Sequence, residues 1–134
     1  MQIATHQFAE TSVAMPVGRI DHRNAAAFEA ALLPLLAQAA QNKGALVLDL
    51  SGVDYISSVG LRVLMIAAKQ MRAAEASLVV ASLQSVVAEI FTISRFDKIL
   101  TVCGSLDDAM ALHSAAAQAA YRAKYDTNGA GGAA

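Results

Sequence analysis

Two adjacent serines, Ser57 and Ser58, stand where an apolar segment ends and a helical pattern begins, and their hydroxyl groups are the strongest candidates for chemistry in this chain. A hydroxyl at a helix start accepts a hydrogen bond from a free amide of the first turn, so these serines can serve simply as caps. The same free amides and the positive end of the helix dipole also stabilise a phosphate group. Because no His or Lys nearby in sequence could act as a general base, we interpret a serine here as a substrate of phosphorylation and not as a nucleophile.

Other catalytic and ligand-binding patterns are missing from the sequence. It contains no GxxxxGK[ST] phosphate loop, no GxGxxG after a strand, no GxSxG elbow and no HExxH. The three histidines stand far apart and Cys103 is the single cysteine, so we expect no metal site, no cofactor and no intramolecular disulfide. The chain is therefore not expected to be an enzyme.

The composition limits the kinds of partner. The 134 residues carry 10 Lys+Arg against 11 Asp+Glu, and the pI of about 6.3 with dispersed basic residues argues against nucleic-acid binding. No apolar run approaches the roughly 18–20 residues that cross a bilayer, and the first residues lack the features of a secretory signal. We expect one soluble, cytosolic domain over residues 1–120 without direct membrane insertion. Residues 121–134 form an extension that is expected to be disordered from about residue 126, because the side chains from there on are too small and polar to form a buried core.

The hydropathy pattern predicts the elements that hold the two serines. Short apolar runs predict strands, and apolar residues at helical spacing predict amphipathic helices. The order β β α β α β α β α predicts an α/β fold: a mixed sheet of about five strands, formed by an N-terminal hairpin plus buried strands, with about four helices packed on it. Asp21 or Asn24 is expected to cap the first helix, and Pro34 is expected to kink it. The predicted strands lie within Ile3–Phe8, Ser12–Val17, Ala45–Leu50, Ser77–Ala81 and Ile99–Val102, and the predicted helices within His22–Gln41, Gly60–Met71, Leu83–Ser94 and Ser105–Ala120.

Three separate segments resemble the STAS domains of stand-alone bacterial anti-sigma factor antagonists. The stretch Leu46–Leu64 is similar to the core motif of that family, and Gly18–Asp21, read as Gly-Arg-Ile-Asp, is similar to the family's Gly-x-Leu-Asp. Phe91–Leu100 together with Ser105–Ala109 resembles its closing pattern. The resemblance covers about residues 8–115 in the correct order, and it implies the STAS fold.

The resemblance also implies a regulatory switch. In this family, the partner is a serine kinase of the histidine-kinase-like ATPase fold that is itself an anti-sigma factor and phosphorylates the antagonist. A PP2C-type serine phosphatase reverses the modification. Unphosphorylated antagonist binds the kinase and frees its sigma factor or other client. In the family pattern Asp-Ser-Ser/Thr-Gly, the phosphoacceptor corresponds to Ser58, while Ser57 stands at the Asp position and Val59 at the second hydroxyl position.

The resemblance assigns partner binding to the start of the helix and to Asp21, which corresponds to an acidic residue flanking the same surface. Because Ser57 replaces the family's Asp, it is the alternative phosphoacceptor. Gly60 is expected to let a partner backbone approach the first turn. Arg95 stands where relatives often have Gly, and it is strained if that position closes a helix in the left-handed conformation. The expected partner-binding residues are Asp21, Ser57, Ser58, Val59, Gly60, Leu61 and Arg62.

Two alternative functions remain open at this stage. The first is a constitutive STAS scaffold subunit, associated with a transporter or a stressosome-like assembly, in which the serines are only caps. A phosphopeptide would count against it. The second is a phosphoacceptor domain of the receiver type that uses Asp49 at a strand end, although the opening hairpin disagrees with the βα start of such domains. Labelling of Asp49 by acetyl phosphate would support it.

Overall fold

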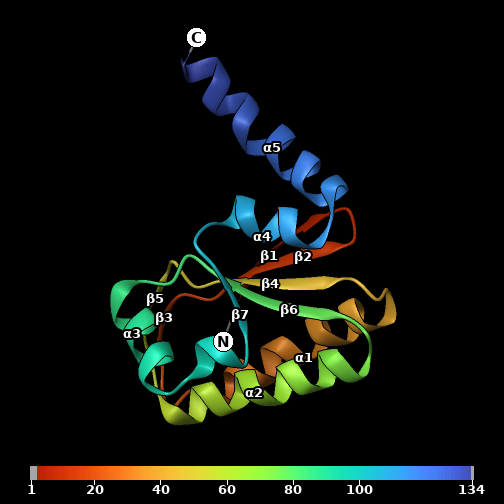
Figure 1. The fold of residues 1–134 in the computed structure, drawn as a ribbon. Coiled ribbons are helices and arrows are strands. Elements are labelled where there is room, and N and C mark those ends of the chain that lie inside the picture. Colours follow the sequence, from red (N-terminus) through yellow and green to blue (C-terminus); the bar gives the residue numbers. More distant parts are fainter. Residues whose placement is uncertain (1–2, 134) are drawn as a thin grey trace.

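A mixed five-stranded sheet lies between two groups of helices in the computed structural model, which describes residues 3–133 and their side chains as far as Tyr125 (Figure 1). In spatial order the strands are β1 (Ala4–Phe8), β2 (Thr11–Met15), β4 (Ala45–Asp49), β6 (Ser77–Ala81) and β7 (Thr101–Cys103). The hairpin β1–β2 is antiparallel, and the other neighbouring strands run parallel. The predicted α/β fold with a mixed sheet of five strands is therefore confirmed.

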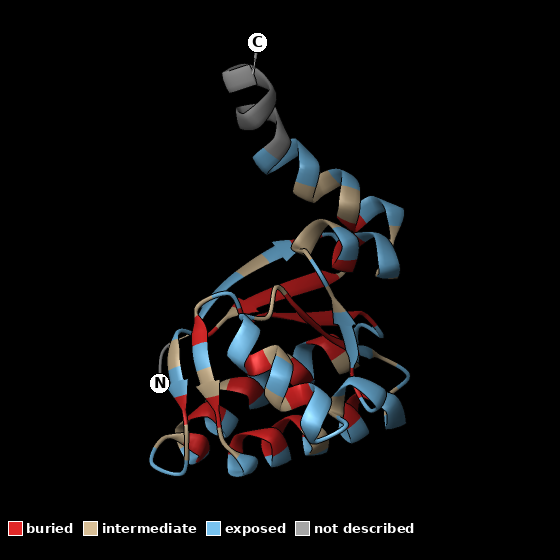
Figure 2. Cartoon of the chain, turned by 60° about the vertical axis from the view of Figure 1, so that its left-hand side comes forward, coloured by how far each residue is buried: buried red, intermediate tan, exposed pale blue. Residues whose placement is uncertain are grey.

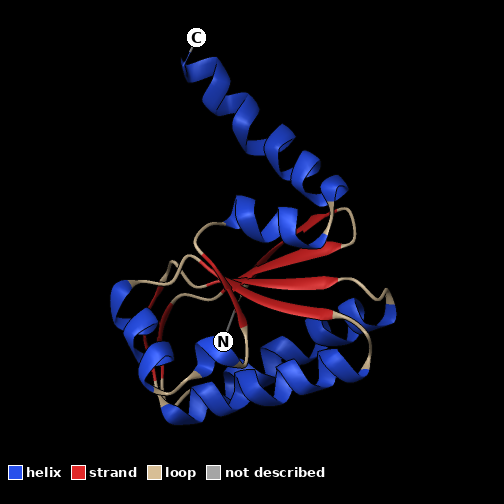
Figure 3. Cartoon of the chain, in the orientation of Figure 1, coloured by secondary structure: helices blue, strands red, loops and turns tan. Residues whose placement is uncertain are grey.

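Helices cover both faces of this sheet (Figure 3). On one side lie α1 (Ala25–Gln41), α2 (Ser58–Ala73) and α3 (Ser85–Ile93); the 3₁₀ helix η1 (Phe96–Lys98) follows α3, and α4 (Leu106–His113) and α5 (Ala115–Ala133) lie on the other side. Side chains of a strand alternate between faces, so Leu46 and Leu48 join the core under α1 and α2 while Val47 joins the core under α4. All five residues of β4 are buried, as expected for a continuous apolar run in a central strand (Figure 2).

A second, two-stranded parallel ribbon was not predicted from the sequence. It consists of β3 (Gly18–Ile20) and β5 (Val53–Ile56), which the hydropathy pattern assigned to connecting segments. Both strands are too short to show a period of their own, and their pairing depends on contacts distant in sequence. Gly18 enters the ribbon with φ +97° and its amide donates to the carbonyl of Gly52 across 2.8 Å.

Several helix boundaries differ from the predicted ones, by two residues at each end of α2 and by one or two residues at the ends of α3, and two further differences have a local cause. The first helix begins at Ala25 and not at His22, because residues 21–24 form a hydrogen-bonded turn before it. It continues through Pro34 as one helix, and the kink there stays a prediction. The last predicted helix is divided at Ser114, whose extended backbone ends α4 and whose hydroxyl accepts the Ala117 amide at 2.9 Å to begin α5.

The C-terminal helix packs on the domain beyond the predicted boundary at residue 120. The Tyr121 ring meets Phe8 edge to face with 5.5 Å between centroids, and Arg122 pairs with Asp107 through two hydrogen bonds of 2.9 and 3.0 Å. The segment predicted to be disordered, from about residue 126, lies outside the residues whose side chains are described. Among the described helices, none has the length and apolar character needed to cross a bilayer.

Candidate functional site

The β3–β5 ribbon positions the start of α2. Its register pairs Arg19 with Tyr55 and Ile20 with Ile56. Because the strands are parallel, the next residues, Asp21 and Ser57, leave the ribbon at the same end. The Ser57 amide donates to the carbonyl of Ile20 across 2.8 Å, which extends the pairing by one step. Segments 36 positions apart in sequence are thereby joined where the helix begins.

Gly60 lets the first turn of α2 lie directly on the ribbon. A Cβ atom at this position would stand 2.8 Å from Ile20 Cγ2 and 2.8 Å from Ile56 Cγ1, closer than packed carbon atoms approach. Gly60 is buried, and so is Leu61, which is 6% exposed. The expectation that Gly60 opens the first turn to a partner backbone is therefore corrected: the missing side chain makes room for the core beneath, because this face of the helix points inward.

The two serines occupy different environments. Ser57 has extended backbone angles and is the N-cap, and its Oγ accepts the Gly60 amide at 3.2 Å. Ser58 is the first helical residue and is exposed, and among the described residues its hydroxyl has no hydrogen-bond partner. The first-turn amides of Ser58 and Val59 likewise find no acceptor in the described part of the chain. The capping role is thus filled by Ser57, while the hydroxyl of Ser58 is open to solvent.

Asp21 is fixed by a local hydrogen-bond network. Its Oδ1 accepts the Arg23 amide at 2.9 Å, and its Oδ2 pairs with Arg19 Nε at 3.1 Å. The Asp21 amide in turn donates to Asn24 Oδ1 at 2.8 Å, so Asn24 is the N-cap residue of α1 but turns its side chain back to the preceding turn. The pKa of Asp21 is held below its ordinary value, first by the hydrogen bond from the Arg23 amide and then by the hydrogen bond and charge of Arg19. Partial burial of the carboxylate opposes this lowering but does not cancel it. This carboxylate stays charged beside the start of α2.

Arg19 and Tyr55 complete the site, although the sequence patterns did not point to them. The Arg19 guanidinium lies over the Tyr55 ring, 4.1 Å from its centroid, while it also pairs with Asp21. The two residues are cross-strand neighbours in the ribbon. Only the pairing of β3 with β5 brings them together, so their cooperation has no signal in local sequence.

A shallow apolar depression adjoins the exposed serine. It has a volume of about 240 Å³ and lies between the first turns of α1 and α2. Val59, which is 44% exposed, and Arg62 line its α2 side, while Ala26 and Glu29 line its α1 side. Of the expected partner-binding residues, Ser58, Val59 and Arg62 are therefore exposed on one surface.

The described residues contain no group of three or more His, Cys, Asp and Glu side chains arranged to hold a metal ion. Asp49, the candidate of the receiver-type alternative, is 8% exposed, and its Oδ1 accepts the Ser51 amide at 3.0 Å. With this hydrogen bond, the Asp49 carboxylate stabilises the turn after β4.

The hairpin-led mixed sheet, the parallel ribbon and the exposed helix start define an α/β domain of the STAS type. The chain belongs to the STAS domain family, whose family model matches residues 2–109. The described part of α5 that packs on Phe8 and Asp107 lies beyond this match.

Known relatives agree with this classification. A candidate anti-sigma factor antagonist of Bordetella bronchiseptica, BtrV, is 42% identical over 94 residues, which cover 70% of this chain and 78% of that protein. An anti-sigma factor antagonist of Mycobacterium paratuberculosis has a similar structure, with a TM-score of 0.73, 26% identity and coverage of 84% of this chain and 92% of that one. A candidate antagonist of Thermotoga maritima gives a TM-score of 0.75 at 18% identity, with coverage of 83% and 93%.

A more distant likeness connects the fold to SpoIIAA of Bacillus. This anti-sigma factor antagonist has been solved in unphosphorylated and phosphorylated forms, which give TM-scores of 0.58 and 0.57. The identities are 12% and 13%; both matches cover 81% of this chain, and they cover 93% and 96% of those chains. At this identity the comparison shows the fold alone.

Proposed function

We propose that this protein is an anti-sigma factor antagonist that binds a cognate anti-sigma serine kinase through the exposed start of α2, and that phosphorylation of Ser58 releases it. The kinase would have the histidine-kinase-like ATPase fold, and a PP2C-type serine phosphatase would restore the binding form. The antagonist supplies a surface and a hydroxyl group, while the partners supply the catalysis. Both partners and the sigma factor or other client would be cytoplasmic.

Family membership and the names of the relatives support the antagonist role. The STAS match spans most of the chain, and BtrV at 42% identity is named for this role. SpoIIAA, whose fold this chain shares, exists in phosphorylated and unphosphorylated forms. These comparisons support the class of function, and the geometry of this chain supports the choice of Ser58 that the family pattern implies.

The different exposure of the two serines carries the choice of Ser58. The Ser57 hydroxyl is engaged with the Gly60 amide, so a kinase would have to break the helix cap to use it. Ser58 is the first helical residue, and its exposed hydroxyl has no hydrogen-bond partner among the described residues. Ser58 can therefore enter a kinase active site while α2 keeps its cap.

Phosphorylation of Ser58 would change the charge of the surface without unfolding the domain. The phosphate adds about −1.5 to −2 charges at pH 7 beside amides that lack an acceptor, and the helix dipole favours an anion there. The same charge would lie near the ionised Asp21 and next to the apolar Val59, on the surface that contacts the partner. Binding would then weaken through repulsion and through the cost of removing water from the phosphate.

The test uses the purified protein and its cognate serine kinase, identified by pull-down. Incubation with ATP should add one phosphate to the peptide containing residues 53–62 of the wild type and of Ser57→Ala, but not of Ser58→Ala. Ser58→Asp should bind the kinase at least about tenfold more weakly than Ser58→Ala. Modification of Ser57 alone would transfer the switch to the alternative acceptor.

The scaffold alternative predicts a different outcome. A constitutive STAS subunit of a transporter or stressosome-like assembly would remain unmodified and would bind its partner equally well as Ser58→Ala and Ser58→Asp. Ser105 provides a matched control, because its hydroxyl caps α4 by accepting the Asp108 amide at 3.2 Å and lies outside the proposed surface. Ser105→Ala should leave both phosphorylation and kinase binding unchanged.

A further inference from the structure

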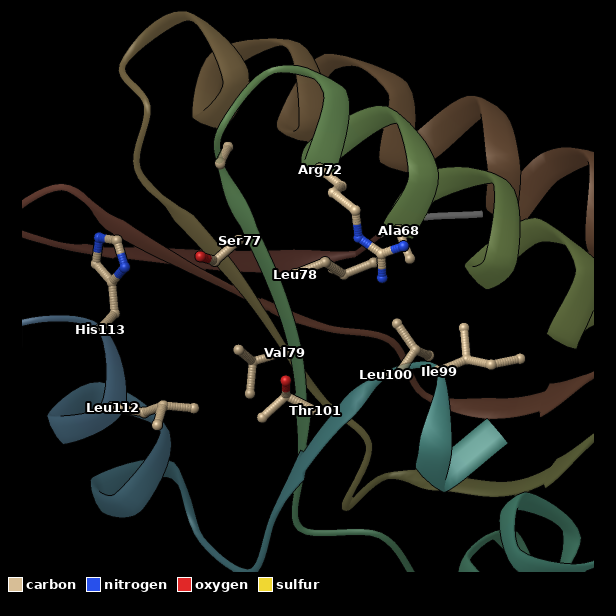
Figure 4. Close-up of a pocket in the computed structure, with 11 residues that line it drawn as sticks. Ala68, Arg72, Ser77, Leu78, Val79, Ile99, Leu100, Thr101, Leu112 and His113 are labelled. Carbon is tan, nitrogen blue, oxygen red and sulfur yellow. The ribbon is translucent and has the colours of Figure 1, made fainter. Parts of the chain in front are cut away.

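A cavity of about 400 Å³ opens at the edge of the main sheet, away from the start of α2 (Figure 4). It lies where β6 meets β7, with the last turns of α2 on one side and the end of α4 on the other. The volume falls within the range of small-molecule sites, about 300–1,000 Å³. The space is therefore large enough for a small organic ligand.

The cavity exists because β6 is longer than the strand beside it. β7 pairs only with Val79–Ala81, so Ser77 and Leu78 have no partner on the β7 side. The chain before β7 turns away through η1 and Ile99, and this turn exposes the floor of the cavity. Two unpaired residues are too few for a stable additional strand, which favours a compact ligand over an extended peptide.

Most of the residues that line the cavity are apolar. Val79 and Leu100 form part of its wall, and two exposed side chains, Ile99 at 41% and Leu112 at 58%, stand at its mouth. An aliphatic chain lying there would remove apolar surface from water on both partners. The wall thus suits the hydrocarbon part of a ligand.

One positive charge faces this apolar space. The Arg72 side chain, from the last turn of α2, extends toward Leu78 and Ile99, and no described residue forms an ion pair or side-chain hydrogen bond with its guanidinium (Figure 4). The other basic group, His113, lies 3.8 Å from the Glu10 carboxylate, which matches its charge when it is protonated. The Arg72 guanidinium is therefore a charged hydrogen-bond donor at the cavity that can bind a carboxylate.

We propose that this cavity binds a small amphiphile that carries a carboxylate, with its aliphatic chain over Leu78 and Leu100 and its carboxylate on Arg72. The hydroxyl groups of Ser77 and Thr101 also line the cavity, on the side of Val79 and His113. The inference does not depend on the phosphorylation of Ser58, because no residue of the cavity belongs to that surface.

Decanoate is a suitable probe, titrated into the ¹⁵N-labelled full chain below its critical micelle concentration and followed by amide chemical shifts. Saturable shifts should appear at Leu78, Val79 and Leu100. Decanol should bind more weakly, and a decyl ammonium salt should bind least, because the fixed charge is positive. Absence of saturable decanoate shifts, or shifts confined to other faces, would contradict the proposal.

Two variants and one control separate the charge of Arg72 from the apolar space of the cavity. Arg72→Gln should weaken decanoate about tenfold while leaving decanol nearly unchanged, since a charge-assisted bond is lost. Lys69→Gln removes an exposed charge of the same helix that does not line the cavity, and it should retain wild-type binding. Thr101→Phe should fill the cavity and abolish binding of both probes, at an exposed strand position that accepts aromatic residues. Equal losses in Arg72→Gln and Lys69→Gln would show only general charge attraction and overturn the assignment.

Discussion

The amide of Ser57 donates to the carbonyl of Ile20 across 2.8 Å, immediately after the last paired residues of β3 and β5. This hydrogen bond fixes the residue before α2 to the residue before Asp21. The helix start, the capping hydroxyl and the charged carboxylate therefore share one rigid support, which the short ribbon provides. A partner that contacts both Ser58 and Asp21 meets a preformed surface.

Loss of the Ser57 hydroxyl should destabilise the domain, whereas loss of the Ser58 hydroxyl should not. Ser57→Ala removes the acceptor of the Gly60 amide and should lower the free energy of unfolding by about 1 kcal/mol. Ser57→Asp should restore this stability, because a carboxylate caps equally well and favours the helix dipole. Ser58→Ala should stay within about 0.5 kcal/mol of wild type in urea titrations. Equal losses for both alanine variants would contradict the division of roles.

Gly60→Ala should separate α2 from the ribbon. The new methyl group would lie 2.8 Å from both Ile20 and Ile56. Overpacking of this kind lowers the free energy of unfolding by about 1–3 kcal/mol. The higher helix propensity of alanine offsets roughly 1 kcal/mol of this loss. Gly104→Ala is the matched control, because nothing lies within 4 Å of a Cβ there. Urea unfolding should show a loss for the first variant and little change for the second. A kinase-binding assay should show that Gly60→Ala also weakens partner binding, because the helix start has moved.

The sequence allowed the main sheet and the serine pair to be predicted, but not the support beneath them. The continuous apolar run of β4 and the helical spacing of α2 are strong local signals. By contrast, β3 and β5 have three and four residues, and their pairing depends on the long-range contact of Ile20 with Ile56. The inward role of Gly60 follows from that contact. For this reason, the sequence indicated where the helix starts but not which residues of its first turn face solvent and which face the ribbon.

The stability contributed by Asp21 should disappear in acid. Its folded-state pKa is lowered by the Arg23 amide and by Arg19, so its ionised form stabilises the fold at pH values above its unfolded pKa of roughly 4. The contribution is lost as the pH falls through the lower, folded pKa. The difference in unfolding free energy between wild type and Asp21→Asn should thus be constant from about pH 5 to 7 and decrease in more acidic solution. Parallel profiles of the two proteins throughout the acid range would argue against an ionised, hydrogen-bonded carboxylate.

Removal of α5 should uncover an apolar part of the sheet. Ala117 is fully buried, and Tyr121 packs edge to face on Phe8, so a chain that ends at Ser114 should lose about 2–4 kcal/mol of unfolding free energy. A chain that ends at Tyr125 keeps these contacts and should remain within about 0.5 kcal/mol of the full chain. Thermal unfolding of the two truncated chains measures the difference. Equal stability of all three would mean that the domain ends before α5.

The left-handed backbone of Arg95 should make this position prefer glycine. The resemblance to the family predicted strain here if the residue closes a helix, and Arg95 follows α3 with φ +63° and ψ +23°. A side chain with a Cβ atom costs about 1–2 kcal/mol in this conformation. Arg95→Gly should therefore be about 1 kcal/mol more stable to urea than Arg95→Ala, which removes the same exposed guanidinium but keeps the Cβ atom. The two variants share the loss of charge, so their difference isolates the backbone. If Arg95→Ala proved as stable as Arg95→Gly, the left-handed conformation could not be a source of strain.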